Sequence, residues 1–196
     1  MRRRVAGIDE AGRGPLAGPV VAAAVILRRG RPIDGVADSK ALTPEERSEL
    51  NIVIRRDALC FGIGWADRAE IDALNILQAT FLAMRRALLA MPVMPDHVLV
   101  DGNRLPQLGG FGKILTARAI VRGDACTPSI SAASILAKTA RDNYMIQMDT
   151  LYPAYSFAEH KGYCTPDHRR LLEMHGPCPL HRRSFAPVSL RLKADS

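Results

Sequence analysis

Three short apolar runs, each followed by acidic residues and glycine, constrain the fold of this chain more than any other feature. They are Val5–Ile8 before Asp9 and Glu10, Val98–Val100 before Asp101, and Ile120–Val121 before Gly123 and Asp124. Short apolar runs rich in β-branched residues are typical of buried strands. Because strand ends in α/β proteins converge on one edge of the sheet, we expect these acids to meet although they are far apart in sequence.

Asp9 and Glu10 raise a geometric question, because adjacent residues of a regular strand point to opposite faces of the sheet. Both can reach one site only where the strand is bulged or ends. Gly12 and Gly14 favour a break in the strand at this point. A strand that ends in ordinary solvated acids before a turn is the alternative that this segment alone leaves open.

Four carboxylates without neighbouring His or Cys residues suit a hard divalent cation, either Mg²⁺ or Mn²⁺. Two such ions bridged by carboxylates can activate a water and stabilise the leaving oxygen of a phosphodiester. The sequence therefore predicts a phosphodiester-cleaving metal site, with four candidate ligands: Asp9, Glu10, Asp101 and Asp124.

The remaining segments alternate between strand and helix patterns. Strands are predicted at Val20–Leu27 and Phe61–Trp65, and helices at Ile71–Met91, Pro128–Met148 and Asp167–His175. This alternation predicts an α/β fold with a mixed sheet.

Two capping boxes, Thr43–Glu46 and Asp67–Glu70, predict further helix starts. The helix predicted over residues 71–91 carries a stripe of apolar residues at steps of three and four, which we assign to the core. The stripe consists of Leu74, Leu77, Phe81, Met84 and Leu88.

The helix predicted after Asp124 carries hydroxyl and cationic side chains on one face. Ser131, Ser134, Lys138 and Arg141 recur there at steps of three and four. Such a face suits a phosphate backbone. A solvated polar face is the alternative that the helix alone does not exclude.

The net charge of +7 and the pI of about 9.6 favour an anionic partner such as nucleic acid. Charge alone does not separate such a protein from a generally basic enzyme.

The cysteines form no CxxC pair, and the basic start Met1–Arg4 leads directly into the first motif without the apolar stretch of a secretory signal. No apolar run reaches the ~18 residues that span a bilayer. We therefore expect a cytoplasmic protein with reduced thiols and no membrane contact. The absence of a coiled-coil repeat favours a monomer.

The last quarter of the chain is rich in His, Pro and Arg. A zinc site built from its histidines and from Cys164 and Cys178 is disfavoured, because Gly162 and Pro166 interrupt any regular helix and no close Cys pair exists. Tyr163 in a basic loop instead suggests an aromatic ring that stacks on a sugar or base. A tyrosine packed in the core is the alternative.

In these motifs the chain resembles ribonuclease HII, the type 2 ribonuclease H family of bacteria. The resemblance is collinear from about Val5 to Val188. Its carriers occur in the same order and spacing: Gly7–Pro15, Asp38–Lys40, Asp101–Asn103, Gly123–Asp124, Ser131–Lys138, His160–Tyr163 and His181–Phe185.

The resemblance implies an RNase H-like core at residues 1–150 and a small helical, basic, substrate-contacting subdomain at residues 151–196, joined in one compact unit. It implies that the four acids are catalytic and bind metal, and that the turn Gly12, Arg13, Gly14 reads the ribose 2′-OH. It further implies that Tyr163 contacts the RNA–DNA junction. Three positions match phosphate contacts: Lys40, Ser134 and Lys138.

We therefore predict an endonuclease that hydrolyses the RNA strand of RNA–DNA hybrids and also cuts at single ribonucleotides embedded in duplex DNA. In-line attack of water would leave 3′-OH and 5′-phosphate ends. The alternatives are a general RNase H-like DNA nuclease and a non-catalytic hybrid-binding module. Departures from the family pattern at Arg122, Ala125, Cys126 and Cys164 remove no proposed catalytic group.

Overall fold

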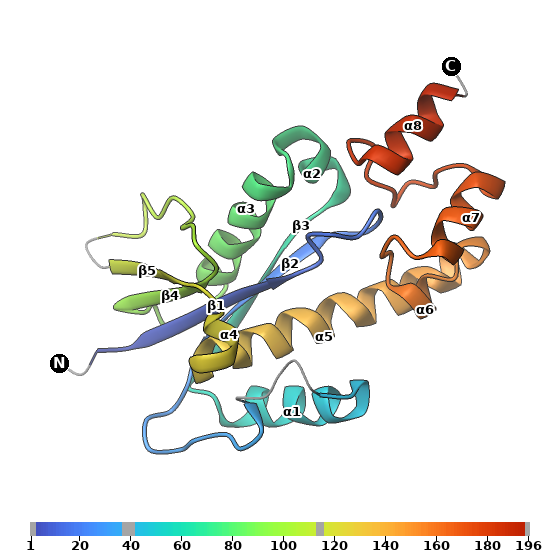
Figure 1. The fold of residues 1–196 in the computed structure, drawn as a ribbon. Coiled ribbons are helices and arrows are strands. Elements are labelled where there is room, and N and C mark those ends of the chain that lie inside the picture. The colour runs from blue at the N-terminus through green and yellow to red at the C-terminus, as the bar shows by residue number, and fades with distance from the viewer. Residues whose placement is uncertain (1–2, 37–41, 113–115, 195–196) are drawn as a thin grey trace.

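The computed structural model describes residues 3–36, 42–112 and 116–194, which form a five-stranded mixed sheet with helices on both faces (Figure 1). The strands are β1 (Val5–Ala11), β2 (Val20–Ile26), β3 (Cys60–Ala66), β4 (His97–Asp101) and β5 (Thr116–Ile120). Their order in the sheet is β3-β2-β1-β4-β5. β1 pairs antiparallel with β2 and parallel with β4, so the predicted α/β fold with a mixed sheet is confirmed.

The helices are α1 (Pro44–Asp57), α2 (Arg68–Leu74), α3 (Ile76–Leu89), α4 (Gly123–Cys126), α5 (Pro128–Leu151), α6 (Phe157–His160), α7 (Pro166–His175) and α8 (Ala186–Ala194), with a 3₁₀ turn η2 (Pro153–Tyr155). Helix α3 covers one face of the sheet and α5 the other, and α1 packs against α5 (Figure 1). In the described part of the chain, no helix is both long and apolar enough to cross a membrane.

Both predicted capping boxes are confirmed. The Thr43 hydroxyl accepts from the Glu46 amide at 3.2 Å, and the Glu46 carboxylate accepts from the Thr43 amide at 2.8 Å. Asp67 and Glu70 form the same reciprocal pair at the start of α2. These starts were predictable because a capping box involves only residues within one turn.

The single helix predicted over residues 71–91 is wrong, because the chain breaks at Asn75 into α2 and α3. Asn75 adopts φ 69°, and its side chain accepts from the amides of Leu77 and Gln78, so it caps α3. Asparagine tolerates this left-handed region better than most residues. As a consequence Leu74, which we assigned to the core, is 44% exposed, whereas Met84 and Leu88 are buried as expected.

Residues after α5 form more helix than predicted. The helix predicted at Asp167–His175 is confirmed as α7, but α6 and α8 were missed because they are short or carry a weak apolar pattern. The strand predicted around Ile120 and Val121 starts earlier and ends at Ile120, which leaves Val121 70% exposed.

Small residues let the helices approach the sheet closely. Gly62 and Gly64 of β3 face the backbone of α3, where an added Cβ on either glycine would lie 2.1 Å from the Ala87 or the Ala83 carbonyl oxygen. On the opposite face, a Cβ on Gly7 would lie 2.2 Å from the Ser129 carbonyl carbon at the start of α5. These contacts fix both helices relative to β1, which carries the first two acids.

We predict that Gly64→Ala destabilises the protein by about 2–3 kcal/mol, because backbone atoms cannot swing away from the added methyl group. Thermal denaturation would then show a melting temperature lower by roughly 5–10 °C. Gly109→Ala is the matched control, since a Cβ at Gly109 meets nothing within 4 Å. Equal melting temperatures for the two variants would contradict this packing.

Candidate active site

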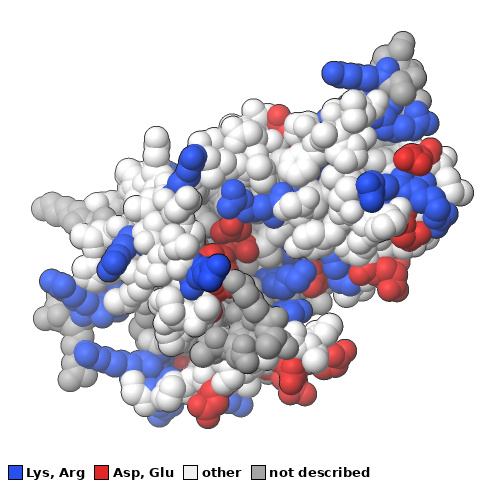
Figure 2. Space-filling model, viewed as in Figure 1, with Lys and Arg blue, Asp and Glu red and all other residues white. Residues whose placement is uncertain are grey.

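The predicted acids come together at one edge of the sheet. The last β1–β4 pair is Ile8 with Val100, and Asp9 and Asp101 are the next residues of these parallel strands. β5 lies beside β4, and the turn after it leads to Asp124 in α4. On the face shown in Figure 2, a small acidic area near the middle is bordered by Lys and Arg side chains.

β1 ends at Ala11, one residue after Glu10 and directly before Gly12, so the strand ends where we expected, although no bulge precedes the end. β1 stays in regular register with β2 through Ala11, so the two side chains lie on opposite faces of the sheet. Glu10 and Asp101 line one hollow of about 310 Å³. Asp9 is buried beside it, and the charges of Glu10 and Asp101 act on its carboxyl group.

Backbone amides hold Asp101 and thereby the turn that carries Asp124. The Asp101 Oδ1 atom accepts from the Gly123 amide at 2.7 Å and from the Asp124 amide at 3.4 Å. The Ser131 hydroxyl donates to the Asp124 carbonyl oxygen at 2.5 Å, which ties the same turn to α5. The three acid-bearing segments are therefore joined by hydrogen bonds as well as by strand pairing.

Two of the acids at this edge, Asp9 and Glu10, have raised pKa values. Burial, followed by the charges of Glu10 and Asp101, raises the pKa of Asp9 well above its usual value. Burial also raises the pKa of Glu10, although its ion pair with Arg13 at 3.3 Å acts in the opposite direction. A cation placed among these carboxylates would lower the pKa values of both Asp9 and Glu10, because it favours the ionised forms.

The donor set fits a hard divalent cation in its chemistry, since it consists of carboxylate oxygens without a soft ligand. Among the described residues, no three His, Cys, Asp or Glu side chains stand in an arrangement that would already hold a metal ion. The charges of Glu10 and Asp101 act on Asp9, so these three carboxylates lie near one another.

The turn after β1 lies directly beside Glu10. Gly12 adopts φ 95°, and a Cβ on it would lie 2.1 Å from the Nε atom of Arg141. Gly14 has open space around it, and the Arg13 side chain is half exposed. Glycine is therefore required at position 12 by both backbone conformation and close approach, and Gly14 leaves room for a ligand.

A second hollow, of about 390 Å³, adjoins Glu10 on the α5 side of the sheet. Among its lining residues are four that we predicted to contact substrate: Gly12, Ser134, Lys138 and Tyr163. The Lys138 ammonium lies 5.2 Å from the centre of the Tyr163 ring, which is 39% exposed. Lys40, the other predicted phosphate contact, lies outside the described residues.

Sequence reasoning missed several residues that line the two hollows. Arg47 of α1 lines the second, and Leu77, Phe81 and Arg104 line the first. Leu77 and Phe81 belong to the stripe that we assigned entirely to the core. The only sequence signal for them was their helical spacing, which does not tell whether a sheet or an open hollow lies opposite.

The polar face predicted on α5 is divided in the structure. Ser134 and Lys138 reach the second hollow, but Ser131 and Arg141 are fully buried. Arg141 donates to the carbonyl oxygens of Pro19 and Ala17, at 3.0 and 3.1 Å. The expectation of four phosphate-binding side chains is therefore wrong for Ser131 and Arg141, because other segments cover that part of the helix.

Comparison with known proteins agrees with this geometry. The family model described as Ribonuclease HII matches residues 6–188. Ribonuclease HII of Acidovorax sp. (strain JS42) is 60% identical over 190 residues, which are 97% of this chain and 88% of that protein. Ribonuclease HII of Bordetella pertussis (strain Tohama I) is 54% identical over 184 residues, 94% and 89% of the two chains.

The chain belongs to the ribonuclease HII family. It is an endonuclease of the ribonuclease H class that acts on RNA–DNA hybrids, and the predicted family and enzyme class are confirmed. The fold agrees as well, since the crystal structure of ribonuclease H2 from Pyrococcus horikoshii OT3 superimposes with a TM-score of 0.82 at 28% identity. That match covers 97% of this chain and 98% of the archaeal one.

In this member of the ribonuclease HII family, a chain of histidines supports the Tyr163 loop. His168 Nδ1 lies 2.9 Å from the Tyr163 carbonyl oxygen, and its Nε2 lies 3.0 Å from Nε2 of His181. The Cys178 amide donates to His181 Nδ1 at 3.0 Å. The ring nitrogens that a zinc site would use are therefore engaged in hydrogen bonds.

These contacts assign one tautomer to each ring. His168 must carry its proton on Nδ1 to donate to the Tyr163 carbonyl, so its Nε2 accepts from a protonated Nε2 of His181. Protonation of either ring would place two N–H groups face to face. In agreement, burial lowers the pKa of His168 to about 4, and burial followed by the charge of His168 lowers that of His181 to about 4.

We predict that the protein loses stability as pH falls from about 6.5 to about 4. The unfolded chain takes up protons on both histidines near the ordinary pKa of 6.5, whereas the native state does so only near 4, so acid favours unfolding. His168→Asn keeps a donor for the Tyr163 carbonyl but does not titrate. Its melting temperature at pH 7.5 should be lower than that of the wild type.

Between pH 7.5 and 4.5, the unfolding free energy of His168→Asn should then fall by less than that of the wild type, with a difference on the order of 1–2 kcal/mol. The melting temperature of the variant should accordingly fall by less over the same pH range. His175→Asn is the matched control, since His175 is exposed on α7. Parallel pH profiles for the two variants would contradict the assignment of neutral buried histidines.

Proposed function

We propose that this protein cleaves RNA–DNA hybrids, and duplex DNA at single embedded ribonucleotides, with Mg²⁺ or Mn²⁺ held by Asp9, Glu10, Asp101 and Asp124. The observation that carries the proposal is the position of Glu10, which lines one hollow with Asp101 and a second with Gly12, Lys138 and Tyr163. The Asp101 carboxylate also accepts from the backbone of the turn that carries Asp124. Family membership supports dependence on a divalent metal, without distinguishing the two ions.

When bound, the divalent ions would supply an activated water and stabilise the leaving oxygen of the scissile phosphodiester. The chain's own residues hold the substrate around that centre. Lys138 and Ser134 are in position to bind phosphate oxygens, and the half-exposed Tyr163 ring offers a stacking surface. In-line attack of water would leave 3′-OH and 5′-phosphate ends.

The turn of Gly12, Arg13 and Gly14 is the part of the site that we assign to recognition of the 2′-OH. It adjoins Glu10, so a ribose bound there would lie close to the acids. The 2′-OH would then serve recognition and not act as the nucleophile. A 2′,3′-cyclic phosphate among the products would contradict this mechanism.

We propose further that the protein acts as a monomer in the cytoplasm, with residues 1–150 as the catalytic core and residues 151–196 as the part that contacts substrate. The four cysteines are free in the structure, which agrees with a reducing compartment. Sedimentation equilibrium should give a mass near 21.4 kDa, and a mass of twice that value would argue against the monomer.

The proposed function is tested with three duplexes: an RNA–DNA hybrid, a DNA duplex with one ribonucleotide, and the all-DNA duplex of the same sequence. Each is incubated with Mg²⁺, Mn²⁺ or EDTA, and the ends of the products are determined. We expect cleavage of the first two only, and only with metal. Cleavage of the all-DNA duplex would favour a general nuclease, and cleavage of none would favour a binding module.

Substitution of the acids gives a second test. We expect Asp9→Asn and Asp101→Asn to lose detectable cleavage at saturating Mg²⁺. In EDTA, Asp9→Asn should melt no lower than the wild type, because the substitution replaces a buried carboxylate of raised pKa by an uncharged group. Mg²⁺ should raise the melting temperature of the wild type but not of this variant.

Asp167→Asn is the matched control, because Asp167 is exposed and pairs only with Arg170 among the described residues. It should cleave at the wild-type rate. Wild-type turnover by Asp9→Asn or Asp101→Asn would overturn the assignment of these residues as metal ligands.

A further inference from the structure

A buried arginine from the C-terminal part of the chain, Arg182, forms hydrogen bonds to the backbone of the turn after β1. Arg182 is 0% exposed, and its guanidinium donates to four carbonyl oxygens. The acceptors are Gly12 at 2.6 Å, Gly18 at 2.9 Å, Arg13 at 3.0 Å and Pro19 at 3.2 Å. One side chain thus holds both ends of the segment from Gly12 to Pro19.

Arg141 completes this support from α5. It is also 0% exposed and binds the carbonyls of Ala17 and Pro19, so two guanidinium groups lie under one loop. Among the described residues, neither forms an ion pair with a carboxylate. Burial, followed by the charge of Arg141, lowers the pKa of Arg182 to about 9. Burial of two cations without a carboxylate partner has a desolvation cost, which their hydrogen bonds to carbonyl oxygens offset.

The geometry of a trans peptide shows the consequence for the turn. The C=O and N–H bonds of one peptide unit point in opposite directions. Because Arg182 draws the carbonyls of Gly12 and Arg13 inward, the amides of the following residues, Arg13 and Gly14, must point outward. Arg182 thus favours one orientation of these two peptide units, in which their N–H groups are directed away from its guanidinium.

We propose that Arg182 is a positioning residue for substrate selectivity, which orients the Arg13 and Gly14 amides so that they donate to the 2′-oxygen of the ribonucleotide at the cleavage site. This inference rests on the proposed function, in which the turn recognises the 2′-OH. It adds that the recognising atoms are held by a residue that does not itself touch substrate.

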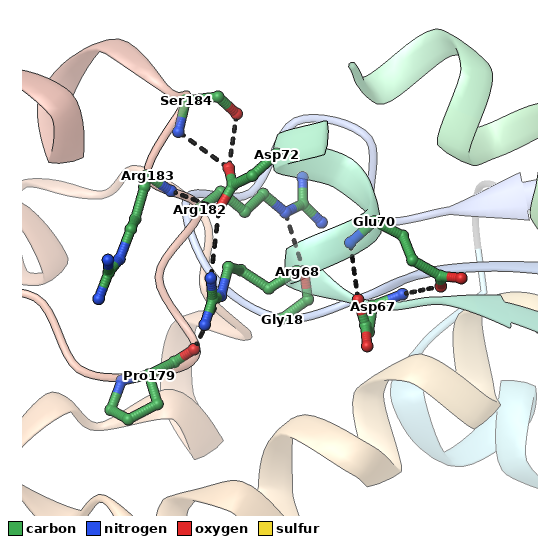
Figure 3. Close-up of polar contacts among 9 residues, drawn as sticks. All are labelled: Gly18, Asp67, Arg68, Glu70, Asp72, Pro179, Arg182, Arg183 and Ser184. Carbon is green, nitrogen blue, oxygen red and sulfur yellow. Dashed lines mark hydrogen bonds and ion pairs between the residues drawn. The ribbon is translucent and has the colours of Figure 1, made fainter. Parts of the chain in front are cut away.

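The structure also offers a control that separates this role from simple attachment of the C-terminal segment. Asp72 of α2 accepts from the Arg183 amide and from the amide and hydroxyl of Ser184 (Figure 3). These bonds tie the residues next to Arg182 to the core without contacting the turn. Asp72→Asn therefore weakens the attachment of the C-terminal segment to the core, whereas the hydrogen bonds from Arg182 to the Gly12 and Arg13 carbonyls remain.

The test compares wild type, Arg182→Lys and Asp72→Asn. Lysine keeps the charge but cannot form the four-bond fork. Hydrogen exchange of the peptide that contains residues 12–19 reports on the turn without substrate. With Mg²⁺, kcat and KM are measured for the single-ribonucleotide duplex, and cleavage of the all-DNA duplex is checked. Selectivity is measured as the ratio of the Kd values of the two duplexes. Melting temperature reports on the fold of each variant.

We expect faster exchange of the Arg13 and Gly14 amides in Arg182→Lys, and a KM higher by about tenfold, the size expected for weakened hydrogen bonds in a charged site. The preference for the ribonucleotide duplex should fall, while kcat stays within about threefold because the acids are untouched. Asp72→Asn should melt lower but keep the KM and selectivity of the wild type.

Unchanged exchange in Arg182→Lys, or faster exchange with unchanged selectivity, would overturn the proposal. So would the same loss of selectivity in Asp72→Asn. If the wild type cut both duplexes equally, the proposed function would fail instead, and the exchange data would still show whether Arg182 orders the turn.

Should Arg182→Lys not fold, Phe185→Leu replaces it, since the Phe185 ring lies 5.0 Å from the Arg182 guanidinium carbon. That variant should shift exchange and KM in the same direction by a smaller factor.

Discussion

Asp9 keeps its carboxylate at 6% exposure between β1 and α5, and the folded chain must bear the cost of that burial. The Glu10 amide, which donates to Asp9 at 2.7 Å, offsets part of the cost, whereas the charges of Glu10 and Asp101 add to it. A flexible framework would let such groups separate. The backbone-to-backbone contacts at Gly7, Gly62 and Gly64 prevent this, since they lock α5 and α3 onto the sheet at van der Waals distance.

Positive charge is arranged around this acidic centre at two depths. At the surface, Lys138 and Arg13 line the hollows, where each is paired with a carboxylate, Asp142 and Glu10 respectively. Beneath the turn, Arg141 and Arg182 are buried and reach only carbonyl oxygens. The exposed cations can attract any nucleic acid. The buried ones act on backbone orientation, which is the property that could distinguish a ribose from a deoxyribose.

Local sequence patterns predicted the strands, the capping boxes at Thr43 and Asp67, and the meeting of the acids, because each depends on neighbouring residues or on a general rule of sheet topology. The break at Asn75 was missed because the apolar spacing continues across it. The burial of Arg141 was missed because helical periodicity shows which residues share a face, and not what covers that face. No local pattern links Arg182 to Gly12, since the contact joins positions 170 residues apart.

That separation matters while the protein is being made. Gly12 leaves the ribosome early, whereas the guanidinium that orders its carbonyl is supplied by a residue synthesised 170 positions later. A nascent chain can therefore assemble β1, β2 and the first acids well before its selectivity turn acquires its support. An unfinished polypeptide that ends before Arg182 would have the paired strands but not the side chain that holds the Gly12 and Arg13 carbonyl oxygens.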